Sequence, residues 1–127
     1  IKNNLSNNIC SITLGNTKHK RDYLFIDDLI ELLFKLNNLK NINKGISILN
    51  IGSGIPIDVN QILVKIMMIL DIKIKVNIDP LKFRNDEYDI EYCDINKISR
   101  LTGWEPKTSL ENGLKQYIKT EFNELII

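Results

Sequence analysis

The feature that most constrains the fold is a short apolar run that ends in a glycine turn and leads into a helix. Residues 47–51 read Ser-Ile-Leu-Asn-Ile, and an almost unbroken apolar run of this length predicts a strand buried on both faces of a parallel sheet. The turn 52–54 (Gly-Ser-Gly) follows it. Asp58 and Gln61 then form a capping box, which predicts the start of a helix. The order strand, glycine turn, helix is typical of α/β architecture.

The rest of the chain mixes predicted strands and helices. Residues 72–78 alternate apolar and polar side chains and predict a strand with one buried and one exposed face. Two further runs, 10–14 and 21–26, predict strands that pair as a small hairpin. We expect Trp104 to anchor the packing of the last two helices. Capping boxes and a glycine stop predict the remaining helices, which are one starting at Asp28 (with Glu31), a short one over 95–101 ended by Gly103, and one starting at Thr108 (with Glu111).

Length and composition bound the class of protein. A chain of 127 residues suffices for one domain, so we expect residues 1–127 to form a single domain. Lys plus Arg is 17 and Asp plus Glu is 16, a balance that argues against a nucleic-acid partner. A membrane-spanning helix needs about 20 apolar residues, and no apolar run in this chain approaches that length. The first residues also lack the apolar segment of a signal peptide. We therefore expect a cytoplasmic protein with no membrane partner.

The residues that commonly bind metals or act as nucleophiles are sparse. The chain has two cysteines, Cys10 and Cys93, and one histidine, His19. A structural zinc site normally takes four such ligands, so we predict no metal site and expect both cysteines to be reduced thiols. Because the one histidine lies in a basic turn, no Ser/His/Asp set is credible, and we assign no catalytic residue.

Two arginines are candidates for an anion-binding site. Arg21 starts an apolar strand, where packing is expected to hold its side chain, and a guanidinium group held in place suits a phosphate or a carboxylate. Lys18 and Lys20, which flank His19 just before Arg21, are interpreted as solvated residues of a hairpin tip. Arg84 lies in an irregular segment, where it could equally be an exposed loop residue paired with Asp86 or Glu87.

The glycine turn 52–54 is a weaker candidate for phosphate binding. A turn between a strand and a helix can present backbone N–H groups to an anion. The dinucleotide fingerprint needs a third glycine, and Ile57 stands at that position. We therefore favour a plain strand-to-helix turn and assign no cofactor-binding residue.

Several short motifs follow one another in a characteristic order over roughly residues 10–122. They are Leu14-Gly15-Asn16, Lys20-Arg21-Asp22-Tyr23, Ile26-Asp27-Asp28, Leu49 to Gly54, Asp79-Pro80 with Arg84, Cys93 to Lys97, Thr102 to Pro106, and Ser109 to Leu114. This series resembles the extended short-chain dehydrogenase/reductases, the NAD(P)-dependent epimerases, dehydratases and reductases of nucleotide sugars. Within that family it looks most like the GDP-sugar branch, GDP-4-keto-6-deoxymannose reductases and GDP-mannose 4,6-dehydratases. It departs from the family in having Arg84-Asn85 where Arg-Pro is usual.

The resemblance implies a fold and a set of roles. The chain would be the C-terminal, substrate-binding portion of a Rossmann-type α/β enzyme, and the strand over 47–51 would join the parallel sheet of a cofactor domain. Arg21 and Arg84 would bind the diphosphate of a nucleotide-sugar substrate. Asn16, in the turn before Arg21, would lie near the nucleotide. A homodimer is a further partner that the resemblance allows.

The same resemblance indicates what the chain lacks. The family's glycine-rich NAD(P) site and its Tyr-x-x-x-Lys pair have no match here, and Asp22 and Asp28 are interpreted as structural, Asp28 through a helix cap. A full-length parent enzyme would use NAD or NADP, whereas this chain alone is expected to bind neither and to lack catalysis. Two alternatives stay open. One is a stand-alone, non-catalytic module that binds a nucleotide sugar or a protein, and the other is a remnant without function.

Overall fold

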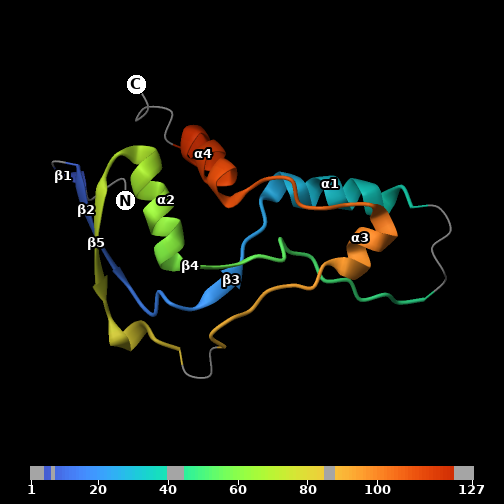
Figure 1. The fold of residues 1–127 in the computed structure, drawn as a ribbon, viewed down its shortest axis with the longest axis horizontal. Helices are drawn as coiled ribbons and strands as arrows, with labels where there is room; N and C mark the ends of the chain where they lie inside the picture. The colour runs from blue at the N-terminus through green and yellow to red at the C-terminus, as the bar shows by residue number, and fades with distance from the viewer. Residues whose placement is uncertain (1–4, 7, 40–44, 85–87, 122–127) are drawn as a thin grey trace.

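The computed structural model describes residues 5–6, 8–39, 45–84 and 88–121, and the α/β class predicted from the sequence is confirmed (Figure 1). The strands are β1 (Leu5–Ser6), β2 (Ile9–Leu14), β3 (Lys20–Asp22), β4 (Pro56–Asp58) and β5 (Lys73–Ile78). The helices are α1 (Ile26–Asn37), α2 (Val59–Leu70), the 3-10 helix η1 (Pro80–Lys82), α3 (Asn96–Thr102) and α4 (Leu110–Glu121). Figure 1 shows β1, β2, β5, α2 and α4 at one end, α1 and α3 at the other, and β3 and β4 between them.

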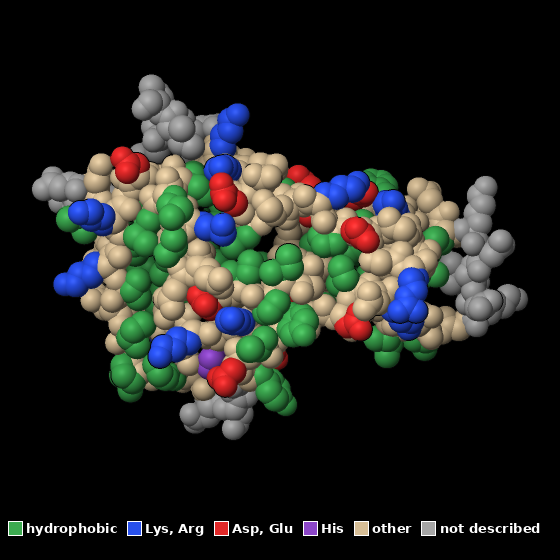
Figure 2. All heavy atoms as spheres, in the orientation of Figure 1, with side chains coloured by type: hydrophobic (Ala, Val, Ile, Leu, Met, Phe, Trp, Pro, Cys, Tyr) green, Lys and Arg blue, Asp and Glu red, His purple; other side chains and the backbone are tan. Residues whose placement is uncertain are grey.

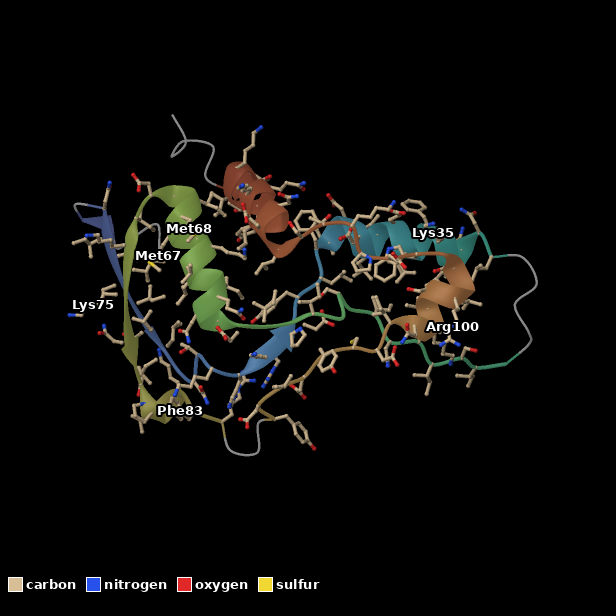
Figure 3. The ribbon with its side chains drawn as sticks, viewed as in Figure 1. Lys35, Met67, Met68, Lys75, Phe83 and Arg100 are labelled. Carbon is tan, nitrogen blue, oxygen red and sulfur yellow. The ribbon has the colours of Figure 1, made fainter. Side chains whose placement is uncertain are left out.

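A parallel pair of strands forms the larger sheet. β2 pairs with β5 in parallel, and β1 adds an antiparallel edge. The strand predicted over 72–78 is confirmed as β5. Its alternation leaves Ile74 and Val76 half-buried, whereas Lys75 is exposed and points away from α2 (Figure 3). The sulfur of Met67 in α2 accepts a hydrogen bond from the backbone N–H of Ile74 at 3.3 Å, so α2 covers the apolar face of the sheet.

The hairpin predicted between residues 10–14 and 21–26 does not form. The first strand exists as β2, but its two edges are taken by β1 and β5. The second strand is shorter than predicted, and β3 pairs antiparallel with β4 instead. Residues 23–25, which the sequence predicts to continue this strand, instead connect β3 to α1, and α1 begins at Ile26.

Local signals at helix ends are confirmed at two positions. α2 begins at the predicted capping box, where the Asp58 carboxylate accepts from the Gln61 N–H at 2.9 Å and the Gln61 side chain accepts from the Asp58 N–H at 3.0 Å. α3 ends at Gly103, whose φ of 63° lies in the left-handed region that favours glycine. None of the helices among the described residues has the length and apolarity to cross a membrane.

The caps predicted for α1 and α4 are wrong, although both helices form. Asp28 lies inside the first turn of α1, and its buried carboxylate accepts hydrogen bonds from the backbone N–H of Thr108 at 2.9 Å and from its hydroxyl at 3.2 Å. Thr108 therefore donates its hydrogen bonds to α1 and does not cap α4. The start of α4 is held by Ser109, whose hydroxyl accepts from the Asn112 N–H at 3.2 Å.

Trp104 anchors a different pair of helices from the one predicted. Leu32 of α1, Ile98 of α3 and Trp104 form one buried cluster. The indole N–H of Trp104 donates to the backbone carbonyl of Asp28 at 2.9 Å. The residue therefore joins α1 to α3 instead of joining the last two helices.

The strand predicted over 47–51 does not form among the described residues. Ile46 is 98% exposed and Ile48 is 79% exposed. An apolar run becomes a strand only when a neighbouring strand pairs with its backbone, and neither sheet of the described structure includes this segment. It is attached by side chains instead, such as Lys97, whose Nζ donates to the carbonyl of Ile48 at 2.7 Å.

Candidate functional site

Arg21 lies in β3, and its guanidinium group is held by its surroundings. Its Nη1 donates hydrogen bonds to the carbonyl oxygens of Lys20 at 2.8 Å and of Tyr88 at 2.9 Å. Its Nε lies 3.0 Å from Oε2 of Glu91, and its side chain is 25% exposed. The side chain is therefore held, as predicted, but by hydrogen bonds and an ion pair and not by the packing that the sequence suggested. Nothing in the sequence marks Tyr88 and Glu91 as its neighbours, because they are distant along the chain.

Backbone pairing beside β3 brings these neighbours to Arg21. The N–H of Lys20 donates to the carbonyl of Asp89 at 2.8 Å, and the N–H of Glu91 donates to the carbonyl of Lys20 at 3.0 Å. Lys20 also forms a parallel bridge with Ile90. The segment 88–91 thus runs along β3 and places one carbonyl and one carboxylate against the arginine.

Asp22, the next residue of β3, is bound by three backbone N–H groups and a hydroxyl. Its carboxylate accepts from the N–H groups of Ser53 at 2.6 Å, Gly54 at 2.9 Å and Cys93 at 3.1 Å, and from the Ser53 hydroxyl. We call Asp22, Ser53, Gly54 and Cys93 together the Asp22 clamp. Burial alone would raise the pKa of Asp22, but these hydrogen bonds outweigh it and hold the pKa below its usual 3.8. The structural role expected for Asp22 is confirmed.

The glycine turn 52–54 does bind an anion, and that anion is the Asp22 carboxylate of the same chain. The turn is therefore structural, as favoured from the sequence. Gly52 is buried, and a Cβ at this position would lie 2.9 Å from the Cβ of Cys93 and closer still to Asp22. Only glycine leaves room for the clamp.

Asn16 lies in the turn between β2 and β3. Its Nδ2 is 2.8 Å from Nε2 of His19, and its Oδ1 accepts from the N–H of Lys18 at 2.9 Å. His19 Nε2 also lies 3.6 Å from a carboxylate oxygen of Asp89. The amide of Asn16 therefore orders the turn that leads into Arg21, and His19 lies beside the segment 88–91.

Arg84 is exposed and follows η1. The helix is fixed at the end of the larger sheet, where Nζ of Lys82 donates to the carbonyl of Thr13 at 3.1 Å. Figure 3 shows the preceding residue, Phe83, at this corner of the molecule. The sheet therefore positions the point from which Arg84 extends.

Chain connectivity limits how far Arg84 lies from Arg21. Arg84 precedes Tyr88 by four residues, and four residues of chain span at most about 14 Å. Tyr88 in turn contacts Arg21 through its carbonyl. Asp86 and Glu87, the acids considered as partners of Arg84, lie outside the described residues.

The surface around these residues carries charges of both signs. On the face in view, Figure 2 shows lysine and arginine side chains interspersed with aspartate and glutamate, without a large field of one sign among the described residues. In the described ranges no group of three or more His, Cys, Asp or Glu side chains is arranged to hold a metal ion. A hollow of about 240 Å³ adjoins the Asp22 clamp through Ser53, and it is lined by neither Arg21 nor Arg84.

Three proteins illustrate what the chain is similar to. UDP-glucuronate 4-epimerase of Thermodesulfobacterium geofontis is 32% identical over 105 residues, which cover 82% of this chain and 31% of that protein. The structure of Thermotoga maritima UDP-glucose 4-epimerase with UDP-glucose matches with a TM-score of 0.75 and 28% identity, over 91% of this chain and 35% of that one. The structure of Bacillus cereus UDP-glucuronic acid 4-epimerase with UDP-glucuronic acid and NAD matches with a TM-score of 0.74 and 28% identity, over 89% and 36%.

These matches fix the family. The chain spans about a third of the length of each of these three proteins. The sequence model of the family described as GDP-mannose 4,6 dehydratase matches residues 1–117, nearly the whole chain. The resemblance seen in the ordered motifs is therefore confirmed, and the chain belongs to the GDP-mannose 4,6-dehydratase family, among the NAD-dependent epimerases, dehydratases and reductases of nucleotide sugars.

Proposed function

We propose that this chain is the nucleotide-sugar-binding part of an NAD(P)-dependent nucleotide-sugar epimerase, dehydratase or reductase. The observation that carries the proposal is that the carbonyls of Lys20 and Tyr88 fix the orientation of the Arg21 guanidinium. The family to which the chain belongs makes a nucleotide sugar the natural ligand of that group. Two solved relatives contain UDP-glucose or UDP-glucuronic acid, both of which carry a diphosphate. The shared chemistry is a diphosphate between a nucleoside and a sugar.

Arg21 and Arg84 are the residues to which we assign the diphosphate. A guanidinium stays charged at any physiological pH and offers paired N–H donors that match phosphate oxygens. The short chain between Arg84 and Tyr88 keeps the two arginines in the same region of the surface. We assign contact with the nucleotide to Asn16, because the turn that it orders leads directly into Arg21.

We assign the NAD or NADP site and the catalytic residues to a cofactor domain joined to this single substrate-binding domain. The relatives are about three times as long as this chain, which leaves room for such a domain. α1 supports the assignment because it is apolar on two sides. Leu32 is buried in the core, whereas Ile30, Leu33 and Phe34 are exposed around a hollow of about 330 Å³. A cofactor domain would cover this face and would pair with the apolar run over 47–51.

A stand-alone binding module is the second candidate. It is favoured by one observation, namely that β3, the segment 88–91 and the Asp22 clamp hold Arg21 and its strand with contacts from this chain alone. Such a module would bind the nucleotide sugar without catalysis. A cytoplasmic location and a homodimer remain part of the proposal in either case.

Binding of nucleotide sugars tests the proposal. Titration calorimetry with UDP-glucose, UDP-glucuronic acid and GDP-mannose is performed on the protein and on its Arg21→Ala and Arg84→Ala variants. Each substitution removes a charge-assisted contact to phosphate, so we expect a loss of affinity of about tenfold or more. Arg100→Ala is the matched control, because Arg100 lies exposed on α3, at the far end of the molecule from the larger sheet (Figure 3).

The outcomes separate the candidates. Equal affinity in the protein and all three variants would remove the site assignment. Binding by the 127-residue chain with the expected losses supports the module, and binding only by a longer polypeptide supports a part of an enzyme. An intact mass near 35 kDa in the source cells, about two to three times the 14.7 kDa of this chain, would favour the enzyme.

A further inference from the structure

Glu91 places a negative charge on the arginine to which we assign the diphosphate. Its Oε2 lies 3.0 Å from Nε of Arg21, and its side chain is 53% exposed. The backbone keeps it there, since the Glu91 N–H donates to the carbonyl of Lys20 at 3.0 Å. The carboxylate is thus attached to a segment that runs along β3 and is held beside Arg21.

Groups other than Glu91 also orient Arg21. Two backbone carbonyls, those of Lys20 and Tyr88, already accept hydrogen bonds from Nη1 at 2.8 and 2.9 Å. These neutral groups fix the plane of the guanidinium without cancelling its charge. Glu91 adds a full negative charge, which lowers the positive potential that an incoming anion meets.

We infer that Glu91 is a residue that lowers affinity at this site, because its carboxylate competes with the phosphate of a nucleotide sugar for Arg21. The inference rests on the proposed function. When the ligand binds, Glu91 either stays beside Arg21 and repels the phosphate or moves into solvent and loses its ion pair. Both routes cost binding free energy, so a nucleotide sugar binds less tightly than Arg21 alone would allow.

The expected effect is modest and depends on salt. Ion pairs between partly exposed side chains are worth up to about 1 kcal/mol, which corresponds to about a fivefold change in affinity. Glu91→Gln keeps the shape and removes the charge, so we expect UDP-glucose and GDP-mannose to bind about two- to fivefold more tightly. The gain is electrostatic and should shrink as salt is raised toward about 1 M, where the Debye length is near 3 Å.

Titration calorimetry of the protein with UDP-glucose and GDP-mannose, at low and high salt, tests the inference. Glu105→Gln is the matched control, because it removes the same charge from an exposed residue in the connection between α3 and α4. Tighter binding of Glu91→Gln at low salt, with Glu105→Gln unchanged, supports the inference. Unchanged binding, or an equal gain in the control, overturns it.

Two further results are informative in opposite ways. Weaker binding of Glu91→Gln overturns the inference and makes Glu91 a residue that positions Arg21. Arg21→Ala distinguishes this failure from a failure of the proposed function. If Arg21→Ala weakens binding while Glu91→Gln does not strengthen it, only the role of Glu91 is wrong. If neither the protein nor Glu91→Gln binds UDP-glucose or GDP-mannose, both the proposed function and the inference fail.

Discussion

The carboxylate of Asp22 accepts a hydrogen bond from the backbone N–H of Cys93 at 3.1 Å, although 71 positions separate the two residues. The same carboxylate holds the turn at Ser53 and Gly54. One side chain therefore joins β3, the glycine turn before β4 and Cys93, two residues after the segment 88–91 that contacts Arg21. The position of the candidate site depends on this junction.

Replacement of the clamp residue should destabilise the fold. Asp22→Asn keeps the shape but turns one acceptor oxygen into an NH₂ group that faces backbone N–H donors. Leaving such donors unsatisfied costs about 1–3 kcal/mol of unfolding free energy, measured by urea denaturation at neutral pH. Asp94→Asn is the control, because this exposed side chain accepts a hydrogen bond from one backbone N–H, that of Asn96 at 2.9 Å, which an asparagine oxygen can still accept. A loss equal to that of Asp94→Asn would show that the clamp does not stabilise the fold.

The stability contributed by Asp22 should also depend on pH. Its folded-state pKa lies below the usual 3.8, so the fold favours the charged carboxylate. The contribution is fully present above the unfolded-state pKa and is lost as the pH falls through the folded-state pKa. We therefore expect the difference in unfolding free energy between the protein and Asp22→Asn to shrink below about pH 4. A difference that stays constant from pH 6 to pH 3, roughly one unit below the model-peptide pKa of Asp, would contradict this.

The contacts between Asp22, the glycine turn and Cys93 should require that residue 52 has no side chain. In Gly52→Ala the new methyl group would lie 2.9 Å from the Cβ of Cys93 and closer to the Asp22 carboxylate. Overpacking of this kind costs about 1–3 kcal/mol, which urea denaturation measures. Asn50→Ala, two positions earlier and exposed, is the control. An unchanged midpoint in Gly52→Ala would mean that the turn can move away from Asp22.

Sequence patterns succeeded where the structure is set by near neighbours. The capping box of Asp58 and Gln61 spans four residues, and the strand β5 is specified by its own alternation. Gly103 ends α3 by adopting a left-handed conformation, and this requires no distant partner. Such features follow from backbone and side-chain chemistry within one turn or one strand.

Sequence patterns failed where a distant partner takes over a local signal. Asp28 has the sequence of a helix cap, but its carboxylate is bound by Thr108, 80 positions away. The glycine turn 52–54 is structural, as its sequence predicts, yet nothing local identifies Asp22 as the anion that it binds. Glu91 was not assigned to the site because its contact with Arg21 exists only once the segment 88–91 lies along β3.

The hydrogen bond from Trp104 to Asp28 should contribute to the packing of α3 on α1. Trp104→Phe keeps an aromatic ring but removes the indole N–H that donates to the Asp28 carbonyl at 2.9 Å. The lost hydrogen bond and the smaller ring together should cost about 2–4 kcal/mol of unfolding free energy. Circular dichroism in urea measures this without relying on the single tryptophan. Tyr117→Phe, at an exposed position of α4, serves as the control, and a loss no larger than its own would contradict the prediction.

The exposed apolar face of α1 gives the sharpest test of whether a cofactor domain covers this chain. Leu33 and Phe34 are 52% and 67% exposed, so changing both to serine should alter the unfolding free energy of the 127-residue chain by only about 0.5 kcal/mol. In a longer polypeptide that buries the face, the same double change should cost about 1.5–3 kcal/mol per side chain.

Leu32→Ser is the control for that comparison, because Leu32 is fully buried and should cost a similar amount in both forms. Urea denaturation of the 127-residue chain and of the longer polypeptide measures both effects side by side. If the double change at Leu33 and Phe34 costs equally little in the two forms, this face is not covered by the rest of the polypeptide. The assignment of this chain to a domain that docks on a cofactor domain through α1 would then be wrong.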